Sequence, residues 1–147
     1  MSVDMDEIVP KLWLGDWSAS RNVEALQARD ITSILCLFEG DALQPEGFIH
    51  RQILIDDHPS VDILVHLRSA IDFIQEQLDT GHGILVHCGA GISRSPTAVA
   101  AYLIYTRNMD VDEAITFIKK KRYVIEPNDG FIKQLRIFRA DNLQLPN

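Results

Sequence analysis

The 147-residue sequence has few of the features that would place a chain outside the ordinary globular class. Its two cysteines are too few for a disulfide-stabilised scaffold. No stretch approaches the roughly 18 consecutive apolar residues of a membrane-spanning helix. The acidic start, Met-Ser-Val-Asp-Met-Asp-Glu, also lacks the apolar segment of a signal peptide. We therefore expect no membrane partner and a cytoplasmic location.

Basic residues are also scarce, with 14 lysines and arginines against 21 acidic residues and a formal net charge of −7. Such a balance argues against nucleic acid as a partner, because affinity for nucleic acid depends on cationic side chains. Apolar and charged contents of 46% and 24% are ordinary. A chain of this length, without repeats or linkers, predicts one domain over residues 1–147, which we expect to be a monomer.

Apolar patterns of strand and helix type alternate along the chain. Strands are predicted near residues 12–14, 31–38, 51–55 and 84–86. Helices are predicted near residues 18–29 and 61–78, from about residue 94, from a cap at residue 110 to residue 121, and from about residue 129. This alternation indicates an α/β fold with a central, mostly parallel sheet flanked by helices. A ligand then belongs at the carboxyl ends of the strands.

The most informative segment is 84–96, Ile-Leu-Val-His-Cys-Gly-Ala-Gly-Ile-Ser-Arg-Ser-Pro. It predicts a buried strand, a tight loop and the start of a helix, since proline is tolerated in a first helical turn. The N-terminus of a helix attracts anions, and successive loop amides can form a concave nest for phosphate oxygens. We expect that nest to be built by Gly89, Ala90, Gly91, Ile92, Ser93 and Arg94.

The side chains of this segment suit phosphoryl transfer. A helix N-terminus and a nearby cation favour the thiolate form of Cys88, which would attack phosphorus and form a phosphocysteine. Arg94 would hold two phosphate oxygens with its planar guanidinium. Ser95 would donate a hydrogen bond to the sulfur as it leaves, and His87 would orient the loop. This mechanism needs no metal or cofactor, and the five histidines are scattered without ligand spacing.

At these residues the chain resembles the dual-specificity phosphatase branch of the cysteine-dependent protein tyrosine phosphatase superfamily. The resemblance spans roughly residues 7–139. Within that span, residues 8–15 are similar to the family's first strand, and the segments 101–104, 109–114 and 127–131 match the family's downstream motifs. It implies the fold of that superfamily and the hydrolysis of phosphotyrosine, with phosphoserine and phosphothreonine as further substrates. The partner would be a phosphorylated protein.

The resemblance also implies residues outside the loop. The family's general acid falls on Asp57, although the adjacent Asp56 is an alternative, and Asp62 more naturally starts the next helix. Asn128 occupies the position whose side chain bonds back to the phosphate-binding loop. Arg122 would lie near a second substrate phosphate, whereas the basic run at 119–122 otherwise suits the C-terminus of a helix.

Other functions remain open from the residues alone. The resemblance implies lysines inside the loop for the phosphoinositide phosphatases of the superfamily. The loop here carries none, which favours protein substrates, and the acidic balance disfavours an RNA 5′-phosphate. A non-catalytic phosphoprotein-binding module and a sulfur transferase are further alternatives, but both the cysteine and the arginine are present here. Cys36 lies in an apolar run and is interpreted as a core residue, with a redox partnership with Cys88 as the alternative.

Overall fold

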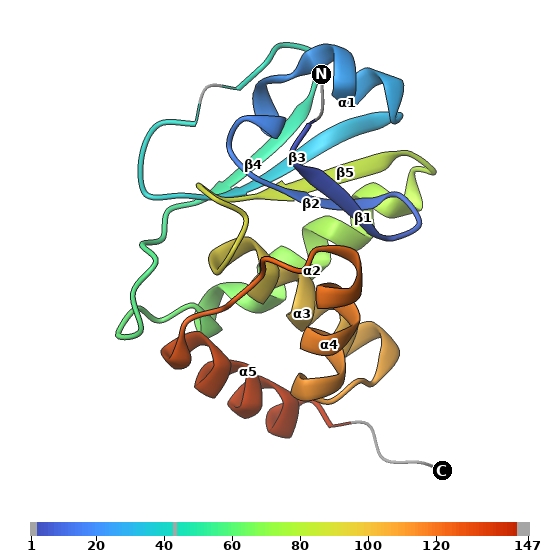
Figure 1. Ribbon diagram of the computed structural model, residues 1–147. Coiled ribbons are helices and arrows are strands. Elements are labelled where there is room, and N and C mark those ends of the chain that lie inside the picture. The colour runs from blue at the N-terminus through green and yellow to red at the C-terminus, as the bar shows by residue number, and fades with distance from the viewer. Residues whose placement is uncertain (1–2, 43, 144–147) are drawn as a thin grey trace.

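A five-stranded sheet forms the centre of the computed structural model, which describes residues 3–42 and 44–143. The strands are β1 (Met5–Val9), β2 (Leu12–Gly15), β3 (Ile31–Leu37), β4 (Ile49–Ile53) and β5 (Gly83–His87), in the order β1-β2-β5-β3-β4. Four of them run parallel, and β1 alone pairs antiparallel with β2 (Figure 1). The predicted α/β fold with a mostly parallel sheet is therefore confirmed.

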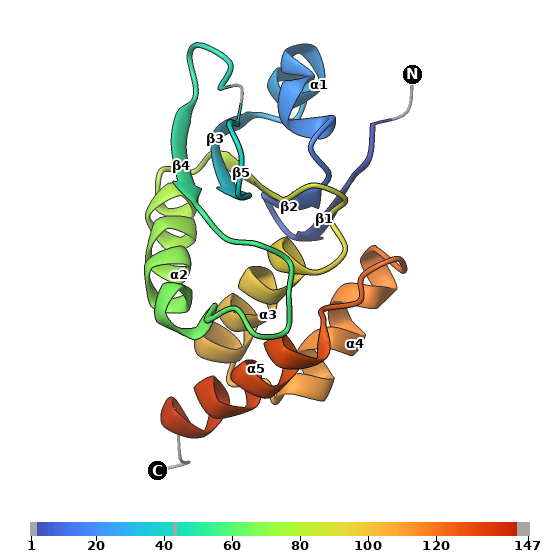
Figure 2. The same cartoon turned by 90° about the vertical axis from the view of Figure 1, so that its left-hand side faces the viewer.

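Helices cover both faces of the sheet. The short α1 (Val23–Ala28), preceded by a 3₁₀ turn at Ala19–Arg21, lies on one face. On the other side lie α2 (Leu64–Asp79), α3 (Arg94–Arg107), α4 (Val111–Lys121) and α5 (Asp129–Asp141), as Figures 1 and 2 show. The main hydrophobic core fills the space between the sheet and these four helices, and a smaller one lies beneath α1. Among the described residues, no helix combines the length and apolar character needed to cross a bilayer.

α3 is the helix that the sheet and the other helices enclose. It is buried from Arg94 to Ile104, which suits its sequence because alanines at 98, 100 and 101 let neighbouring elements approach closely. Its N-terminus directly follows the loop at the end of β5. This central position fixes the direction in which the first turn of α3 points, so the loop before it rests on a rigid base.

Several predicted helix boundaries are confirmed. Asp110 and Glu113 form the reciprocal hydrogen bonds of a capping box at the start of α4. The Asn128 side chain accepts a hydrogen bond from the Phe131 amide and so caps α5. Asp62, expected at the start of the next helix, accepts a hydrogen bond from the amide of Val65, although α2 itself begins two residues later, at Leu64.

The N-terminal elements differ from the prediction. The segment expected to hold one strand is a hairpin of β1 and β2 that turns at Lys11, whose φ is 72°. The helix expected from residue 18 is α-helical only from Val23, because the Asn22 side chain accepts the Ala25 amide and starts the helix there. Capping by asparagine, a local signal, outweighed the apolar spacing.

Elements in the middle of the chain are also shifted. β4 lies at Ile49–Ile53 and not at 51–55, and α2 begins at Leu64 and not at 61. At the start of α2, the amides of Ile63 and Leu64 both donate to Oε1 of Gln134, a residue of α5. This cap comes from a helix about 70 residues away, so the local pattern carries no sign of it.

Substituting Gly130 should disturb the contact between α5 and the loop that follows β4. A Cβ at Gly130 would lie 1.9 Å from the carbonyl oxygen of Pro59, a distance that only a shift of the backbone can relieve. Gly130→Ala should therefore lower the free energy of unfolding by about 1–3 kcal/mol, despite the better helix propensity of alanine. Urea denaturation measures this, with the exposed Lys133→Ala on the same helix as control. Equal stability of Gly130→Ala and wild type would show that the backbones at Pro59 and Gly130 can move apart without a loss of folding free energy.

Candidate active site

The loop of residues 88–93 joins β5 to α3 in the middle of the sheet. Because β5 lies between β2 and β3, the loop is at the carboxyl end of the central parallel strands, where a ligand was predicted. Cys88 is the first residue after β5 and is almost completely buried, with 2% of its surface exposed. The nucleophile predicted from sequence thus lies at the base of the loop.

The carbonyl oxygens of the loop all accept hydrogen bonds from surrounding elements. Two side chains serve as donors: His87 Nδ1 donates to the oxygen of Cys88 (3.1 Å), and the Arg122 guanidinium donates to the oxygens of Ala90 (3.1 Å) and Gly91 (2.9 Å). Backbone amides serve the other three oxygens: the Trp17 amide donates to Gly89 (2.9 Å), the Glu126 amide to Ile92 (2.7 Å) and the Thr97 amide to Ser93 (3.1 Å). The amides of residues 89–94 have no protein acceptor among the described residues. With its oxygens held outside, the loop leaves its N–H groups to bind an oxyanion.

Gly91 makes this curl possible. Its φ is 69°, in the left-handed region that glycine adopts without strain. A Cβ at this position would also lie 2.6 Å from both the Arg122 guanidinium and the carbonyl oxygen of Gly15. The close approach of Arg122 to the outside of the loop therefore requires glycine here.

Ser95 lies beside the nucleophile. Its Oγ is 3.1 Å from Cys88 Sγ, and the side chain is fully buried in the first turn of α3. A hydroxyl at this distance can donate a hydrogen bond to a sulfur anion, while the partial positive charge of the helix N-terminus acts in the same direction. The role expected for Ser95 therefore stays a prediction that this distance permits.

The guanidinium of Arg94 is held on one side only. Its Nη1 donates to the carbonyl oxygen of Ile55 at 3.0 Å and to Oε2 of Glu39, and the group lies 5.4 Å from the centroid of the Phe38 ring. The Nε atom is buried and has no partner within the described part of the chain. Glu39 was not predicted from sequence, although an acidic residue just after a buried parallel strand was a signal for it.

Asp57 is connected to the loop through Asn128. The Asn128 side chain donates to Oδ1 of Asp57 at 2.9 Å, and the Asn128 amide donates to Oγ of Ser93 at 3.0 Å. The expectation for Asn128 is therefore corrected: its backbone, and not its side chain, bonds to the loop, because the side chain is used by Asp57 and the helix cap. Both aspartates are exposed, but among the described residues only Asp57 has such a link to the loop, so the geometry favours Asp57 as the acid.

The expected role of Arg122 at the substrate surface does not agree with its position. Arg122 is only 3% exposed, and its guanidinium bonds to Asp4, to Asp6 and to the outside of the loop. These bonds lower the pKa of Asp4. The basic run suggested an exposed cation, but α4 ends at Lys121 and the chain then turns Arg122 inward. Arg122 supports the loop and does not face solvent.

Two further buried groups are neutral at neutral pH. Burial lowers the pKa of His87 to about 4, so its imidazole is uncharged and acts by donating to the Cys88 carbonyl. Burial also raises the pKa of Cys36 to about 12, and Cys36 is a register partner of His87 across β3 and β5. Its thiol has the properties of the core residue that the sequence indicated.

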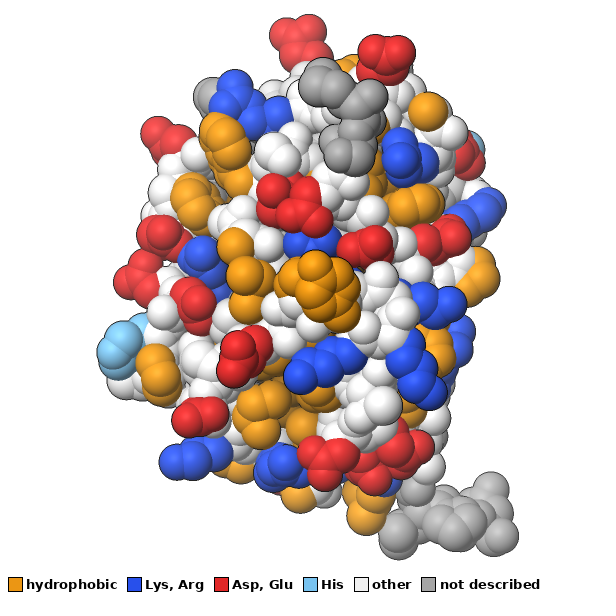
Figure 3. All heavy atoms as spheres, in the orientation of Figure 1, with side chains coloured by type: hydrophobic (Ala, Val, Ile, Leu, Met, Phe, Trp, Pro, Cys, Tyr) orange, Lys and Arg blue, Asp and Glu red, His pale blue; other side chains and the backbone are white. Residues whose placement is uncertain are grey.

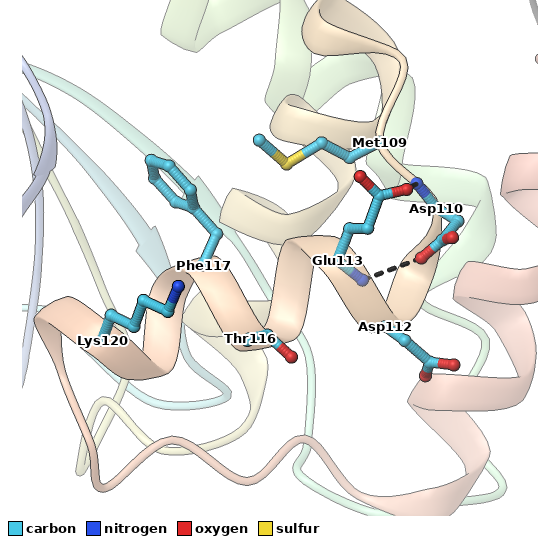
Figure 4. Close-up of a pocket in the computed structure, with 7 residues that line it drawn as sticks. All are labelled: Met109, Asp110, Asp112, Glu113, Thr116, Phe117 and Lys120. Carbon is cyan, nitrogen blue, oxygen red and sulfur yellow. Dashed lines mark hydrogen bonds between the residues drawn. The ribbon is translucent and has the colours of Figure 1, made fainter.

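A separate hollow of about 440 Å³ lies along α4 (Figure 4). Its lining residues are Met109, Asp110, Asp112, Glu113, Thr116, Phe117 and Lys120, none of which belongs to the loop. Asp110 and Glu113 are engaged in the capping box of the helix. Within the described residues, no group of three or more histidine, cysteine or acidic side chains is placed to hold a metal ion.

His87 should make stability depend on pH. Its folded pKa of about 4 lies below the usual 6.5, so the unfolded chain binds a proton that the folded chain does not. Stability should therefore fall as pH drops from about 6.5 to 4, by up to roughly 3 kcal/mol. His87→Asn should flatten this slope in urea denaturation at several pH values, with His66→Asn as the baseline for losing a histidine elsewhere. An unchanged slope in His87→Asn would contradict the assignment.

Replacing Arg122 should lower the activity toward every substrate by a similar factor, because Arg122 supports the loop and does not bind the substrate. Arg122→Met removes two donors to the loop carbonyls, so kcat/KM should fall about tenfold for singly and doubly phosphorylated peptides equally. Lys121→Met, an exposed neighbour, is the control. If only the doubly phosphorylated peptide lost activity, Arg122 would bind a second phosphate after all.

Comparisons with known proteins agree with this geometry. The family model for the dual specificity phosphatase catalytic domain matches residues 12–141. The dual specificity protein phosphatase MPK-4 of Drosophila melanogaster is 38% identical over 93% of this chain and 36% of its own length. Human dual specificity protein phosphatase 2 is 41% identical over 93% of this chain and 44% of its own length. The chain thus spans less than half of these two relatives.

A solved structure is similar over nearly the whole chain. The crystal structure of the human tyrosine phosphatase-like serine/threonine/tyrosine-interacting protein has a TM-score of 0.90 and 33% identity, and the match covers 95% of this chain and 98% of that one. The family match includes the loop, Asp57 and Asn128 within one continuous stretch. The chain therefore belongs to the dual specificity phosphatase family.

Proposed function

We propose that this chain is a protein phosphatase that hydrolyses phosphotyrosine, with phosphoserine and phosphothreonine as further substrates, through a phosphocysteine intermediate. The observation that carries this proposal is the 88–93 loop, whose carbonyl oxygens are bonded outside while its amides are left for an oxyanion above Cys88. Family membership supports the same conclusion.

The proposed reaction has two displacements. In the first, the Cys88 sulfur attacks phosphorus, the bond to the leaving oxygen breaks, and Asp57 gives that oxygen a proton. In the second, water attacks the phosphocysteine, Asp57 accepts a proton from the water, and the sulfur leaves as a thiolate that the Ser95 hydroxyl stabilises. Throughout, the loop amides and Arg94 bind the phosphate oxygens as charge develops on them.

The surface beside the loop supports a protein substrate. Exposed apolar side chains lie there: Ile92 in the loop, and Tyr123 and Val124 in the segment that follows α4. That segment is tied to the loop through Arg122 and through the Glu126 amide, so these side chains border the site. On the face drawn in Figure 3, acidic and basic side chains are interspersed and form no continuous basic band. An apolar border suits a polypeptide better than an RNA or inositol phosphate.

A non-catalytic phosphoprotein-binding module is the second candidate. One human neighbour is named both phosphatase-like and an interacting protein. Likeness of fold does not by itself decide between catalysis and binding. Here Cys88, Arg94, Ser95 and a tethered Asp57 occur together, which favours catalysis. The mechanism requires a reduced Cys88, and the cytoplasm that the sequence suggested provides reducing conditions.

The carboxylate assignment can be tested with a phosphotyrosine peptide. Cys88→Ser should abolish hydrolysis, and Asp57→Ala should lower kcat by about 10²–10⁴-fold, because a positioned acid contributes that much. The loss should be smaller with p-nitrophenyl phosphate, whose leaving group needs less protonation. Asp56→Ala is the matched control and should stay within about threefold of wild type. A larger loss in Asp56→Ala than in Asp57→Ala would reverse the assignment, and full activity in Cys88→Ser would exclude the mechanism.

A further inference from the structure

Arg94 has more hydrogen-bond donors than the protein uses. A guanidinium carries five N–H groups, two of them on Nη1. The two Nη1 groups suffice for the bonds to the Ile55 carbonyl and the Glu39 carboxylate. Nε, by contrast, is buried and unpartnered among the residues that the structure describes. The guanidinium is therefore bonded along one edge and open along the other.

The open edge lies against the loop. A Cβ added to Gly89 would lie 3.3 Å from Nη2 of Arg94, which places this nitrogen next to the loop backbone. The Nε and Nη2 donors lie side by side on a guanidinium and bind two oxygens of one phosphate. The partners of Nη1 thus decide where this pair of donors points.

Glu39 is itself held in place. It follows β3, and the side-chain amide of Gln52 on β4 donates to the carbonyl oxygens on both sides of it, those of Phe38 (3.2 Å) and Gly40 (2.6 Å). The Phe38 amide donates to the Ile53 carbonyl at 3.1 Å, and the Phe38 ring lies against the Arg94 guanidinium. The backbone around Glu39 is therefore fixed to β4, although the Glu39 side chain itself is half-exposed.

We propose that Glu39 is a positioning residue that turns the Nε–Nη2 edge of Arg94 toward the substrate phosphate, and that Gln52 holds Glu39 in the required place. This inference rests on the proposed phosphatase function and adds two residues to it. Glu39 touches neither the nucleophile nor the leaving group, so its effect is transmitted through Arg94.

The opposite interpretation is that Glu39 competes with the phosphate for Arg94. The geometry argues against it, since Glu39 shares Nη1 with the Ile55 carbonyl and leaves the Nε–Nη2 edge free. The two interpretations predict opposite changes in oxyanion binding. Removing a competitor would tighten binding, whereas removing a positioning group would weaken it.

The test compares two substitutions of Glu39. Glu39→Ala should lower kcat/KM for a phosphotyrosine peptide by about 10- to 100-fold, because a small misplacement of a group that binds the transition state has an effect of that order. Glu39→Gln keeps an oxygen acceptor of the same length and should stay within about threefold of wild type. Asp41→Ala, an exposed acidic residue in the same loop, controls for the lost charge and should match wild type.

Tungstate binding separates this inference from the proposed function. In a Cys88→Ser background, which does not turn over, calorimetry should show that Glu39→Ala weakens tungstate binding about tenfold and that Glu39→Gln restores it. Unchanged or tighter binding in Glu39→Ala would overturn the inference even if the wild type is an active phosphatase. An inactive wild type would instead refute the proposed function, whatever the tungstate result.

Gln52 provides an independent check through a double-mutant cycle. If Gln52 acts by holding Glu39, then Gln52→Ala should weaken tungstate binding when Glu39 is present. In the Glu39→Ala variant, the same substitution should cause little further loss of tungstate affinity. Fully additive effects would contradict the proposed link. Thermal denaturation of each variant establishes that the comparison is made between folded proteins.

Discussion

The orientation of six peptide groups is the constraint on which the rest of this structure depends. In the 88–93 loop the carbonyl oxygens point away from the site and are bonded there, which leaves the amides to face an incoming oxyanion. This arrangement is unfavourable in an unfolded chain, because it places several N–H dipoles close together. The arrangement persists because each outward oxygen has a donor, and each such bond contributes about 1 kcal/mol.

Four of the six outward oxygens take their donors from distant parts of the chain, which explains why the whole fold is needed. Trp17 follows β2, and Arg122 and Glu126 follow α4. Arg122 is itself ion-paired with Asp4 and Asp6 near β1, so the first strand and the end of α4 meet behind the loop. The groups of the proposed site are equally dispersed, with Glu39, which contacts Arg94, after β3 and Asp57, the proposed acid, after β4. The sheet brings these ends together at one edge.

The features that could be predicted from the sequence are those encoded locally. The apolar strand, the glycines and the proline of segment 84–96 were sufficient for the loop and the start of α3, and Asp110 with Glu113 for the start of α4. The features that could not be predicted depend on partners remote in sequence. Four features belong here, and each joins residues at least 31 positions apart: the inward turn of Arg122, the bond from Asn128 to Asp57, the cap from Gln134 to α2, and the contact of Glu39 with Arg94. No spacing rule reports such contacts.

The most direct test of the account is whether phosphate passes through Cys88. Enzyme mixed with excess phosphotyrosine peptide and quenched by rapid denaturation within the first turnover should carry phosphate on the Cys88-containing peptide in mass spectrometry. The account predicts that this phosphopeptide appears before the steady state and forms more slowly when Asp57 is replaced by asparagine, which removes the acid of the first displacement. Turnover without any phosphate on Cys88 would contradict it.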